Sequence, residues 1–214
     1  MLKIWGRSNS LNVQKAMWTV GELGIAHERI DVGGRFGGLD RPAYLAMNPN
    51  ARIPTIEDGG VIVWESNAIV RYLSARYGEG VLWDRDPAVR AGADQWMDWM
   101  QTTLAPDFYD LFWKAVRLPA SRQKPEATME AARRLRAHYG VVERQLAGRP
   151  YMLGERLSMA DIVIGATLFR YYEMPIDHPV LPGILSWYQR LSARPAYRTH
   201  VMVPFEELRG SATG

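Results

Sequence analysis

Two short apolar segments separated by a helical pattern open the chain. Residues 2–5 and 28–32 are strand-like runs bounded by glycine. Between them, apolar residues recur at the three- and four-residue spacing of a helix that buries one face: Val13, Ala16, Met17, Val20 and Leu23. The pattern predicts a strand, a helix and a second strand, the unit from which parallel sheets are built.

A hairpin pattern follows, after a short helix and the run Asn48-Pro-Asn-Ala-Arg-Ile-Pro54. Residues 55–57 and 61–64 flank the turn residues Asp58-Gly-Gly60, a combination typical of two antiparallel strands. A helix is then predicted over residues 65–77, with Ile69, Leu73 and Tyr77 on one face. This order of elements predicts a small mixed sheet with helices packed on it, an α/β arrangement.

From residue 78 onward the strand signals stop and helical periodicity dominates. Asp86 and Pro87 are residue types typical of an N-cap and a first helical position. Ser158-Met-Ala-Asp161 has the form of a capping box. Helices are predicted over residues 88–104 with a continuation to 113, over 125–147, from 158 to about 172, and over 181–193. We therefore predict a first domain of residues 1–80, a linker of residues 81–86 and an all-helical domain of residues 87–214.

Composition removes several classes of protein. The chain has no cysteine, which excludes disulfide scaffolds, thiolate zinc sites and a protein thiol nucleophile. The net charge of +3 is too small to predict nucleic-acid binding, and the basic residues Arg133, Arg134 and Arg136 fit a solvated helix face. The four histidines lack metal-ligand spacing, so no metal is expected. No stretch is apolar enough for a signal peptide or a membrane span, which predicts a cytoplasmic protein without membrane association.

Three motifs lie at strand and helix ends of the first domain. Ser10-Leu-Asn12 opens the first helix, where main-chain N–H groups favour an anion, although Ser10 is also a common N-cap. Arg52-Ile-Pro54 precedes the hairpin, and by itself it favours a trans proline with a structural role. Glu65-Ser66 joins the last strand to a helix, where capping is again the simpler interpretation. Their clustering on one small sheet indicates a binding site.

These motifs, in this order and spacing, resemble the soluble glutathione transferases from residue 4 to about residue 203. The resemblance rests on Ser10-Leu-Asn-Val13, Asn48-Pro-Asn-Ala-Arg-Ile-Pro54, Trp64-Glu-Ser-Asn-Ala-Ile-Val-Arg-Tyr72 and Ser158-Met-Ala-Asp161. It implies a thioredoxin-like N-terminal domain, an all-α C-terminal domain and a homodimer. It also implies glutathione as co-substrate.

The resemblance assigns roles to individual residues. Ser10 stands where theta-, phi- and zeta-like members carry the serine that activates the glutathione thiol. Asn12 stands where several bacterial members place an asparagine near the same sulfur. Arg52 matches a basic residue that reaches the glycine carboxylate, Ile53 supplies main-chain bonds to the cysteinyl part, and Pro54 matches a cis proline.

The remaining assignments concern the two ends of the substrate site. Glu65 and Ser66 match the pair that holds the γ-glutamyl amine and carboxylate, and Arg35 is expected to contact glutathione from its loop. A small hydrophobic electrophile is expected in a pocket between the domains, lined by Tyr109 and Trp113.

The predicted function is a glutathione transferase that activates the thiol for attack on an apolar electrophile in detoxification. One alternative is a glutathione-dependent disulfide or peroxide reductase, which without a protein cysteine needs two glutathiones or one glutathione disulfide. A second is a non-enzymatic interaction protein of the same fold. Phi-like members carry a basic pair where this chain has Leu39 and Asp40, so the class stays open. Trp5 and Gly6 occupy the place of the activating tyrosine of other classes, so a tyrosine mechanism is not expected.

Overall fold

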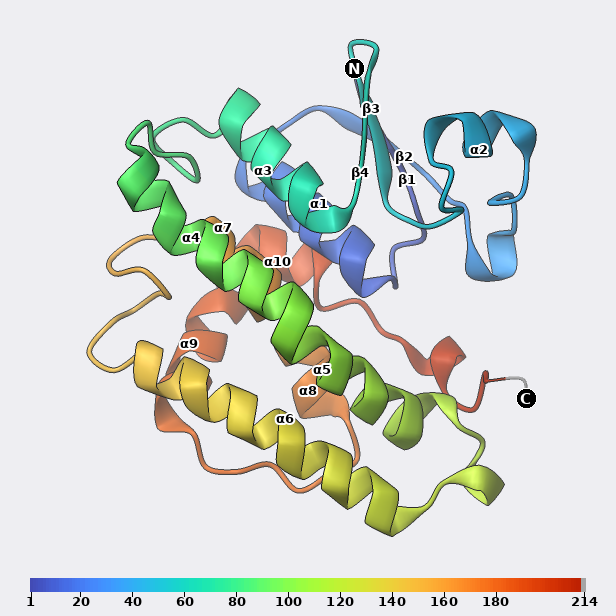
Figure 1. Ribbon diagram of the computed structural model, residues 1–214, viewed down its shortest axis with the longest axis vertical. Coiled ribbons are helices and arrows are strands. Elements are labelled where there is room, and N and C mark those ends of the chain that lie inside the picture. Colours follow the sequence, from blue (N-terminus) through green and yellow to red (C-terminus); the bar gives the residue numbers. More distant parts are fainter. Residues whose placement is uncertain (213–214) are drawn as a thin grey trace. The chain divides into compact units, whose positions relative to one another are not determined.

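The computed structural model describes residues 1–212, which form two compact units (Figure 1). The first unit comprises Met1–Arg90 together with Arg194–Val203. The second comprises Ala91–Ala193 together with the chain from Pro204 onward. The chain therefore returns to the first unit near its end, after it has built most of the second.

The first unit is built on the predicted mixed sheet. Its strands are β1 (Leu2–Trp5), β2 (His27–Ile30), β3 (Thr55–Asp58) and β4 (Val61–Trp64), in the order β2-β1-β3-β4. β1 and β2 are parallel, because the helix between them returns the chain to the same end of the sheet. β3 is antiparallel to both β1 and β4.

Two helices of this unit bury their apolar faces with the sheet. α1 (Leu11–Glu22) and α3 (Ser66–Tyr77) pack against each other. The shared core contains most of the expected periodic set, joined by inward residues of the strands: Leu2, Ile4, Val13, Ala16, Met17, Val20, Ile56, Ile69 and Leu73. Leu23 and Tyr77, also expected on these faces, are not part of it, and Tyr77 is exposed. Between β2 and β3 lie a 3₁₀ turn, η1 (Gly34–Phe36), and the short predicted helix, α2 (Pro42–Met47). The expected α/β order is confirmed.

A helix from the far end of the sequence, α10 (Pro195–His200), packs on α1 and was not predicted. The approach is close because residue 21 is glycine: a Cβ there would lie 2.8 Å from His200 Cδ2 and 2.9 Å from Ala196 Cβ. Trp18 packs edge-on against the Tyr197 ring at 4.7 Å between centroids. Arg194 Nε donates to Glu22 at 2.7 Å.

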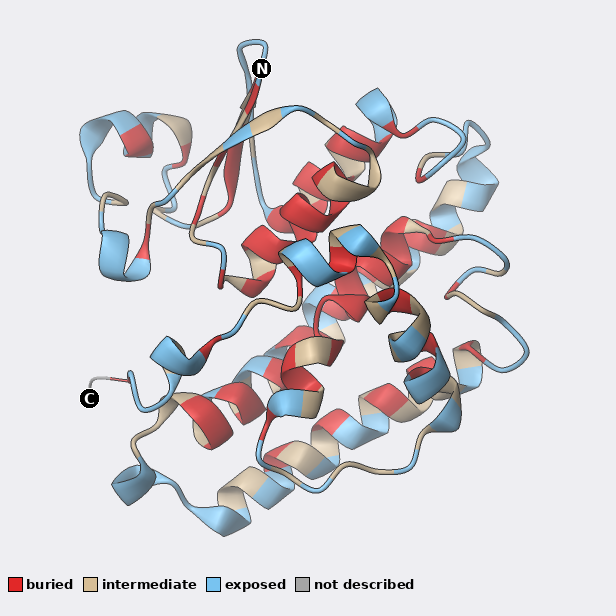
Figure 2. Ribbon diagram, turned by 180° about the vertical axis from the view of Figure 1, so that it is seen from behind, coloured by how far each residue is buried: buried red, intermediate tan, exposed pale blue. Residues whose placement is uncertain are grey.

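The rest of the chain is helical, as expected. Its elements are α4 (Pro87–Trp99), the π-helical turn η2 (Met100–Leu104), α5 (Ala105–Phe112), the π-helical turn η3 (Trp113–Arg117), η4 (Ala120–Arg122), α6 (Pro125–Gln145), α7 (Met159–Gly165), α8 (Leu168–Glu173), α9 (Pro182–Ser192) and η5 (Glu206–Leu208). α6 shows buried, intermediate and exposed residues in turn along its length, as an amphipathic helix does (Figure 2). No helix of the described residues is both long and apolar enough to cross a bilayer.

Helix starts and breaks follow local hydrogen bonding. Asp86 Oδ1 accepts the Ala88 N–H at 2.8 Å, which confirms the N-cap of α4. The helix expected to continue to residue 172 instead breaks between α7 and α8. There Thr167 Oγ1 donates to the Ile164 carbonyl at 2.6 Å and lies 2.8 Å from Tyr139 Oη. A side-chain bond of this kind competes with the main-chain hydrogen bonds of the helix. The spacing of apolar residues does not predict such a break.

The capping box of α7 is present and lies in the core. Asp161 Oδ2 accepts the Ser158 N–H at 2.8 Å and the Ser158 hydroxyl at 2.6 Å. Asp161 Oδ1 accepts the Met152 N–H at 2.8 Å and the Trp187 indole N–H at 3.0 Å. Burial raises the pKa of Asp161 to about 6, while these four bonds act in the opposite direction. The Asp161 carboxylate therefore connects the start of α7, the turn at Met152 and α9.

Candidate active site

The three predicted motifs leave the sheet at one end. Thr55 at the start of β3 pairs with Trp5 at the end of β1 and with Trp64 at the end of β4. Neighbouring strands lie about 5 Å apart, so the segments just beyond these paired residues are neighbours as well. Register alone therefore brings together the loop before Ser10, the Ile53–Pro54 peptide and the Glu65–Ser66 junction.

Ser10 occupies the N-cap position of α1 without serving as a side-chain cap. Its φ of −92° and ψ of 124° are extended, and its carbonyl accepts the Gln14 N–H at 2.9 Å. The hydroxyl makes no hydrogen bond to the first turn of the helix. Ser10 is therefore the N-cap residue of α1, as expected, but its hydroxyl does not make the capping bond. The side chain is half-buried at the N-terminus of α1, the positive end of the helix dipole.

Asn12 and Ser66 come from different motifs and meet in the structure. The Ser66 hydroxyl donates to Asn12 Oδ1 at 3.3 Å, which ties the first turn of α1 to the first turn of α3. Ser66 is buried and Asn12 is half-buried.

The Ile53–Pro54 peptide is cis. The trans form favoured by the motif alone is wrong, and the cis form implied by the family resemblance is confirmed. The main-chain N–H and C=O of Ile53 have no hydrogen-bond partner among residues 1–212. Across the sheet end, Gly6 has a φ of +152°, and a Cβ there would lie 2.4 Å from Val13 Cγ2. Glycine at this position therefore lets the loop before Ser10 pass close to α1.

Two residues that the motif analysis did not single out hold Arg52 in place. Tyr44 Oη donates to the Arg52 carbonyl at 2.6 Å, and Asn48 Nδ2 donates to the same oxygen at 2.9 Å. Both also lie within 3.1 Å of Thr55 Oγ1. The Arg52 side chain itself is exposed. Asn48 stands at the start of the recognised motif, which was the available signal, whereas nothing in the local sequence marked Tyr44.

Glu65 adopts an unusual backbone conformation above a buried amine. Its φ of +69° and ψ of 118° are rare for a residue with a Cβ, and its side chain is exposed. Lys15 of α1 is completely buried and couples electrostatically to Glu65. Burial lowers the pKa of Lys15 to about 7, and the Glu65 charge partly opposes this shift. Sequence analysis missed Lys15, although a lysine among the buried positions of the first helix was a visible signal.

Arg35 lies on the exposed 3₁₀ turn η1. Its guanidinium stacks over the ring of Phe36 at 4.8 Å from the centroid. The neighbouring Gly34 lies against Arg7: a Cβ on Gly34 would come within 2.9 Å of Arg7 Nε. The loop that carries Arg35 therefore lies beside the segment leading to Ser10, and its role in binding stays a prediction.

Tyr109 and Trp113 belong to the helical unit. They are four residues apart, at the end of α5 and the start of η3, which places them on one helix face. Both are exposed, 39% for Tyr109 and 46% for Trp113. The Arg117 guanidinium lies 5.4 Å from the Trp113 ring centroid. An exposed aromatic pair of this kind suits an apolar ligand.

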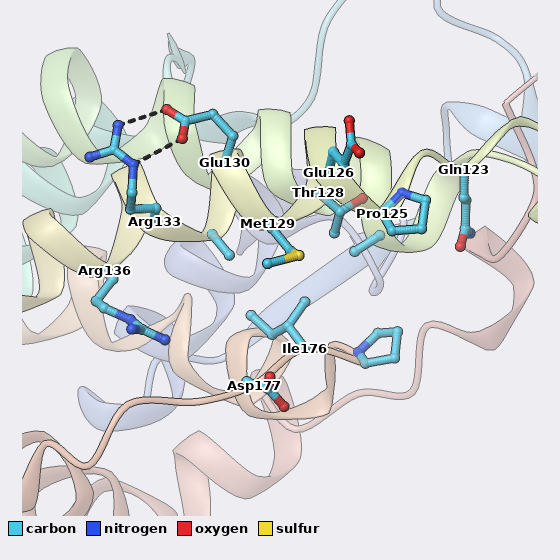
Figure 3. Close-up of a pocket in the computed structure, with 13 residues that line it drawn as sticks. Gln123, Pro125, Glu126, Thr128, Met129, Glu130, Arg133, Arg136, Ile176 and Asp177 are labelled. Atoms are coloured by element: carbon cyan, nitrogen blue, oxygen red, sulfur yellow. Dashed lines mark hydrogen bonds and ion pairs between the residues drawn. The ribbon is translucent and has the colours of Figure 1, made fainter.

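A cavity of about 930 Å³ lies elsewhere in the helical unit, between α6 and residues 175–177 (Figure 3). Met129 and Ile176 line it, and Arg133 on its rim donates to Glu130 at 2.9 and 2.7 Å. Neither Tyr109 nor Trp113 is among its lining residues. Within residues 1–212, no group of three or more potential ligands could hold a metal ion.

Comparisons with known proteins agree with this geometry. Two family models match: "Glutathione S-transferase, N-terminal domain" over residues 1–75 and "Glutathione S-transferase, C-terminal domain" over residues 93–195. Glutathione S-transferase GstB of Escherichia coli strain K12 is 36% identical, covering 95% of this chain and 99% of its own length. A theta class glutathione S-transferase from Xanthomonas axonopodis pv. citri, solved with glutathione bound, is 46% identical with a TM-score of 0.91, over 95% of this chain and 98% of that chain. Bombyx mori glutathione transferase BmGSTD1 is 27% identical with a TM-score of 0.86, over 97% and 95% of the two chains.

Proposed function

Because this chain belongs to the glutathione S-transferase family, we propose that Ser10 activates glutathione at the sheet end where β1, β3 and β4 meet. The co-substrate is glutathione, and the reaction is conjugation of its thiol with an electrophile. In that reaction the thiolate attacks an electrophilic carbon, a carbon–sulfur bond forms, and a leaving group such as a halide departs with its electron pair. The protein has to hold the tripeptide and favour the thiolate.

The Ser10 hydroxyl carries the activating role in this proposal. It is not engaged as a helix cap, so it can donate a hydrogen bond to sulfur at the positive end of α1. The Asn12 side chain, which meets Ser66 where α1 and α3 begin, is the second group that we propose to donate to the sulfur. Neither group has to remove the thiol proton, because stabilising the thiolate is enough to release that proton to water.

The other motifs hold the tripeptide. The unpaired N–H and C=O of Ile53 suit the cysteinyl main chain, which would add to the sheet end as a short extended segment. Arg52 and Arg35 are exposed cations suited to the glycine carboxylate. Glu65 suits the γ-glutamyl ammonium, and Ser66 suits the neighbouring carboxylate at the N-terminus of α3.

The experiment that tests this placement is Glu65→Gln. Removing the charge of a hydrogen-bonded partner costs about 1.5–3 kcal/mol, so we expect the Kd for glutathione to rise by about 10-fold or more. Turnover at saturating glutathione should change little, because Glu65 holds the amine and not the sulfur. Glu28→Gln, on β2, is the matched control and should leave the Kd unchanged. An unchanged Kd in Glu65→Gln contradicts the proposed site.

The remaining proposals concern the second substrate and the cellular setting. We propose a small hydrophobic electrophile that contacts Tyr109 and Trp113, supported by their exposure on one helix face. A homodimer in the cytoplasm with a role in detoxification is also proposed, from family membership and the absence of cysteine. Rates with an aryl halide, a hydroperoxide and a mixed disulfide, measured on one sample, test conjugation against reduction.

A further inference from the structure

The exposed aromatic pair of the helical unit has a cation beside it. Tyr109, Trp113 and Arg117 follow one another at intervals of four residues along α5 and η3. The Arg117 guanidinium carbon lies over the Trp113 ring, 5.4 Å from its centroid. This contact is a cation–π interaction, in which a positive charge lies against the face of a ring. The two residues proposed to contact the electrophile are therefore followed by a positive charge that the conjugation chemistry described above does not use.

The π-helical turn η3 fixes the backbone that carries Arg117. The Leu118 N–H donates to the Trp113 carbonyl at 2.9 Å, which closes one wide turn from Trp113 to Arg117. π-helical turns of this kind occur often at functional sites. The Arg117 carbonyl accepts the Ala212 N–H at 2.9 Å, so the last described segment of the chain also holds this residue. The side chain of Arg117 therefore starts from a backbone that is held on two sides.

One edge of the Arg117 guanidinium is buried without an acceptor. Its Nε is buried and has no hydrogen-bond partner among residues 1–212. The residue as a whole is half-buried, so part of it reaches the surface. Burying a polar atom of a charged group is costly when no partner replaces the lost water. An anion bound at the exposed part of the guanidinium would offset this cost.

The acidic residues on the neighbouring segments pair with other arginines. Asp110 of α5 accepts from Arg134 at 2.6 Å. Glu206 of η5 accepts from Arg209 at 2.7 Å. Within residues 1–212, no carboxylate forms an ion pair with Arg117. The positive charge of Arg117 can therefore bind an anion that a ligand brings.

We propose that Arg117 selects aryl electrophiles that carry a carboxylate, which the guanidinium binds while the aryl ring contacts Trp113. The proposal rests on the proposed contact of the electrophile with Tyr109 and Trp113, and it names the substrate class of that site. A guanidinium suits a carboxylate because two of its N–H groups can donate to the two oxygens in parallel. The carboxylate keeps its charge, and Arg117 takes no part in forming the carbon–sulfur bond. Its effect is on the binding of the electrophile.

Two preformed glutathione conjugates test this contact independently of turnover. The first carries a nitrobenzoate ring, with the carboxylate opposite the sulfur, and the second carries the corresponding nitrobenzamide, which is neutral and of similar shape. Calorimetric titration of the full chain gives the Kd of each conjugate. We expect wild type to bind the acid more tightly than the amide. Arg117→Gln should raise the Kd of the acid by about 10-fold and that of the amide by less than about 2-fold, because only the acid loses a charge-assisted hydrogen bond.

Two controls separate the contact from net charge and from misfolding. Arg122→Gln, on the exposed turn η4, removes the same charge nearby and should leave both Kd values unchanged. Glutathione itself has no aryl group, so it should bind wild type and Arg117→Gln equally, which shows that the variant is folded. Arg117→Lys keeps the charge and loses the parallel donors, so its preference for the acid should be smaller than that of wild type.

The outcomes distinguish a wrong subsite from a wrong electrophile site. If Arg117→Gln binds glutathione normally and shifts the Kd values of both conjugates equally, or shifts neither, the proposal is overturned. If Arg117→Gln does not fold, Arg117→Lys decides, and an undiminished preference for the acid in that variant overturns the proposal. Trp113→Ala should raise the Kd of both conjugates. Unchanged Kd values in Trp113→Ala show that the proposed electrophile site itself is wrong, whereas weaker binding of both conjugates confines the failure to Arg117.

Discussion

Replacement of Ser10 by alanine tests thiol activation most directly. The substitution removes one hydroxyl at the N-cap of α1, and that hydroxyl makes no capping bond. An ordinary N-cap serine contributes about 1 kcal/mol to stability through such a bond. We therefore expect Ser10→Ala to unfold at nearly the wild-type temperature, so that a change in rate reports on chemistry and not on folding.

The size of the rate change follows from the thiol pKa. A thiol with a pKa of about 8.5 is only a few per cent ionised at neutral pH, and lowering that pKa by two units takes about 2.7 kcal/mol. A hydroxyl bond to a charged acceptor supplies about 1.5–3 kcal/mol, and the helix N-terminus about 0.3–1 kcal/mol. Loss of the hydroxyl should raise the pKa of bound glutathione by about 1–2 units. At about pH 6.5, kcat/KM should fall by roughly 10- to 100-fold.

The assay is conjugation of an aryl halide across a pH series, with the thiolate of bound glutathione followed by ultraviolet absorbance. The Kd for glutathione should stay within a few-fold of wild type, because the residues proposed to hold the tripeptide, Arg52, Ile53 and Glu65, are unchanged. The rate deficit should shrink above about pH 8.5, where the thiol ionises without help. A Ser10→Ala protein with wild-type rate and wild-type thiol pKa would refute the assignment, and the same measurements on Asn12→Ala show whether that amide is the activating group.

Two further predictions concern the scaffold. Gly21→Ala should destabilise the protein although alanine is the better helix former by about 1 kcal/mol, because the new Cβ would lie 2.8 Å from His200 Cδ2 and 2.9 Å from Ala196 Cβ. Gly140→Ala in α6, where the new Cβ would lie 3.8 Å from Arg144 Nη1, is the control and should stabilise by up to about 1 kcal/mol in chemical denaturation. Asp161→Ala should cost about 3–5 kcal/mol in the same assay, because it leaves two buried and two partly buried donors without their acceptor; a loss below about 1 kcal/mol would contradict the role given to that carboxylate.

The local pattern of apolar and turn residues determined most of the helices and strands of this protein. The strands and helices of the first 77 residues lie close to where periodicity and turn residues placed them, because each buries a regular set of apolar side chains. The capping box at Ser158 was readable because all of its hydrogen-bonding groups lie within four residues. The motifs at Ser10, Arg52 and Glu65 were readable for the same reason: each stands at a predicted junction between a strand and a helix.

Tertiary structure decided what depends on residues far apart in sequence. The docking of α10 on α1 rests on Gly21, Glu22 and Arg194, which no local window joins. The break at Thr167 depends on a hydroxyl that also meets Tyr139, 28 residues away. The local pattern favoured a trans Pro54, the family resemblance implied a cis bond, and the structure shows the cis bond.

In the proposed site, too, local sequence and tertiary packing determined different features. Sequence supplied the donors and charges at residues 10, 12, 65 and 66, but it was strand register that made them neighbours. Lys15 is buried in a unit where α1 and α3 pack against each other, and this burial lowers the pKa of its amine. Local sequence therefore determined which groups are available, and packing determined which of them meet and how strongly they hold a proton.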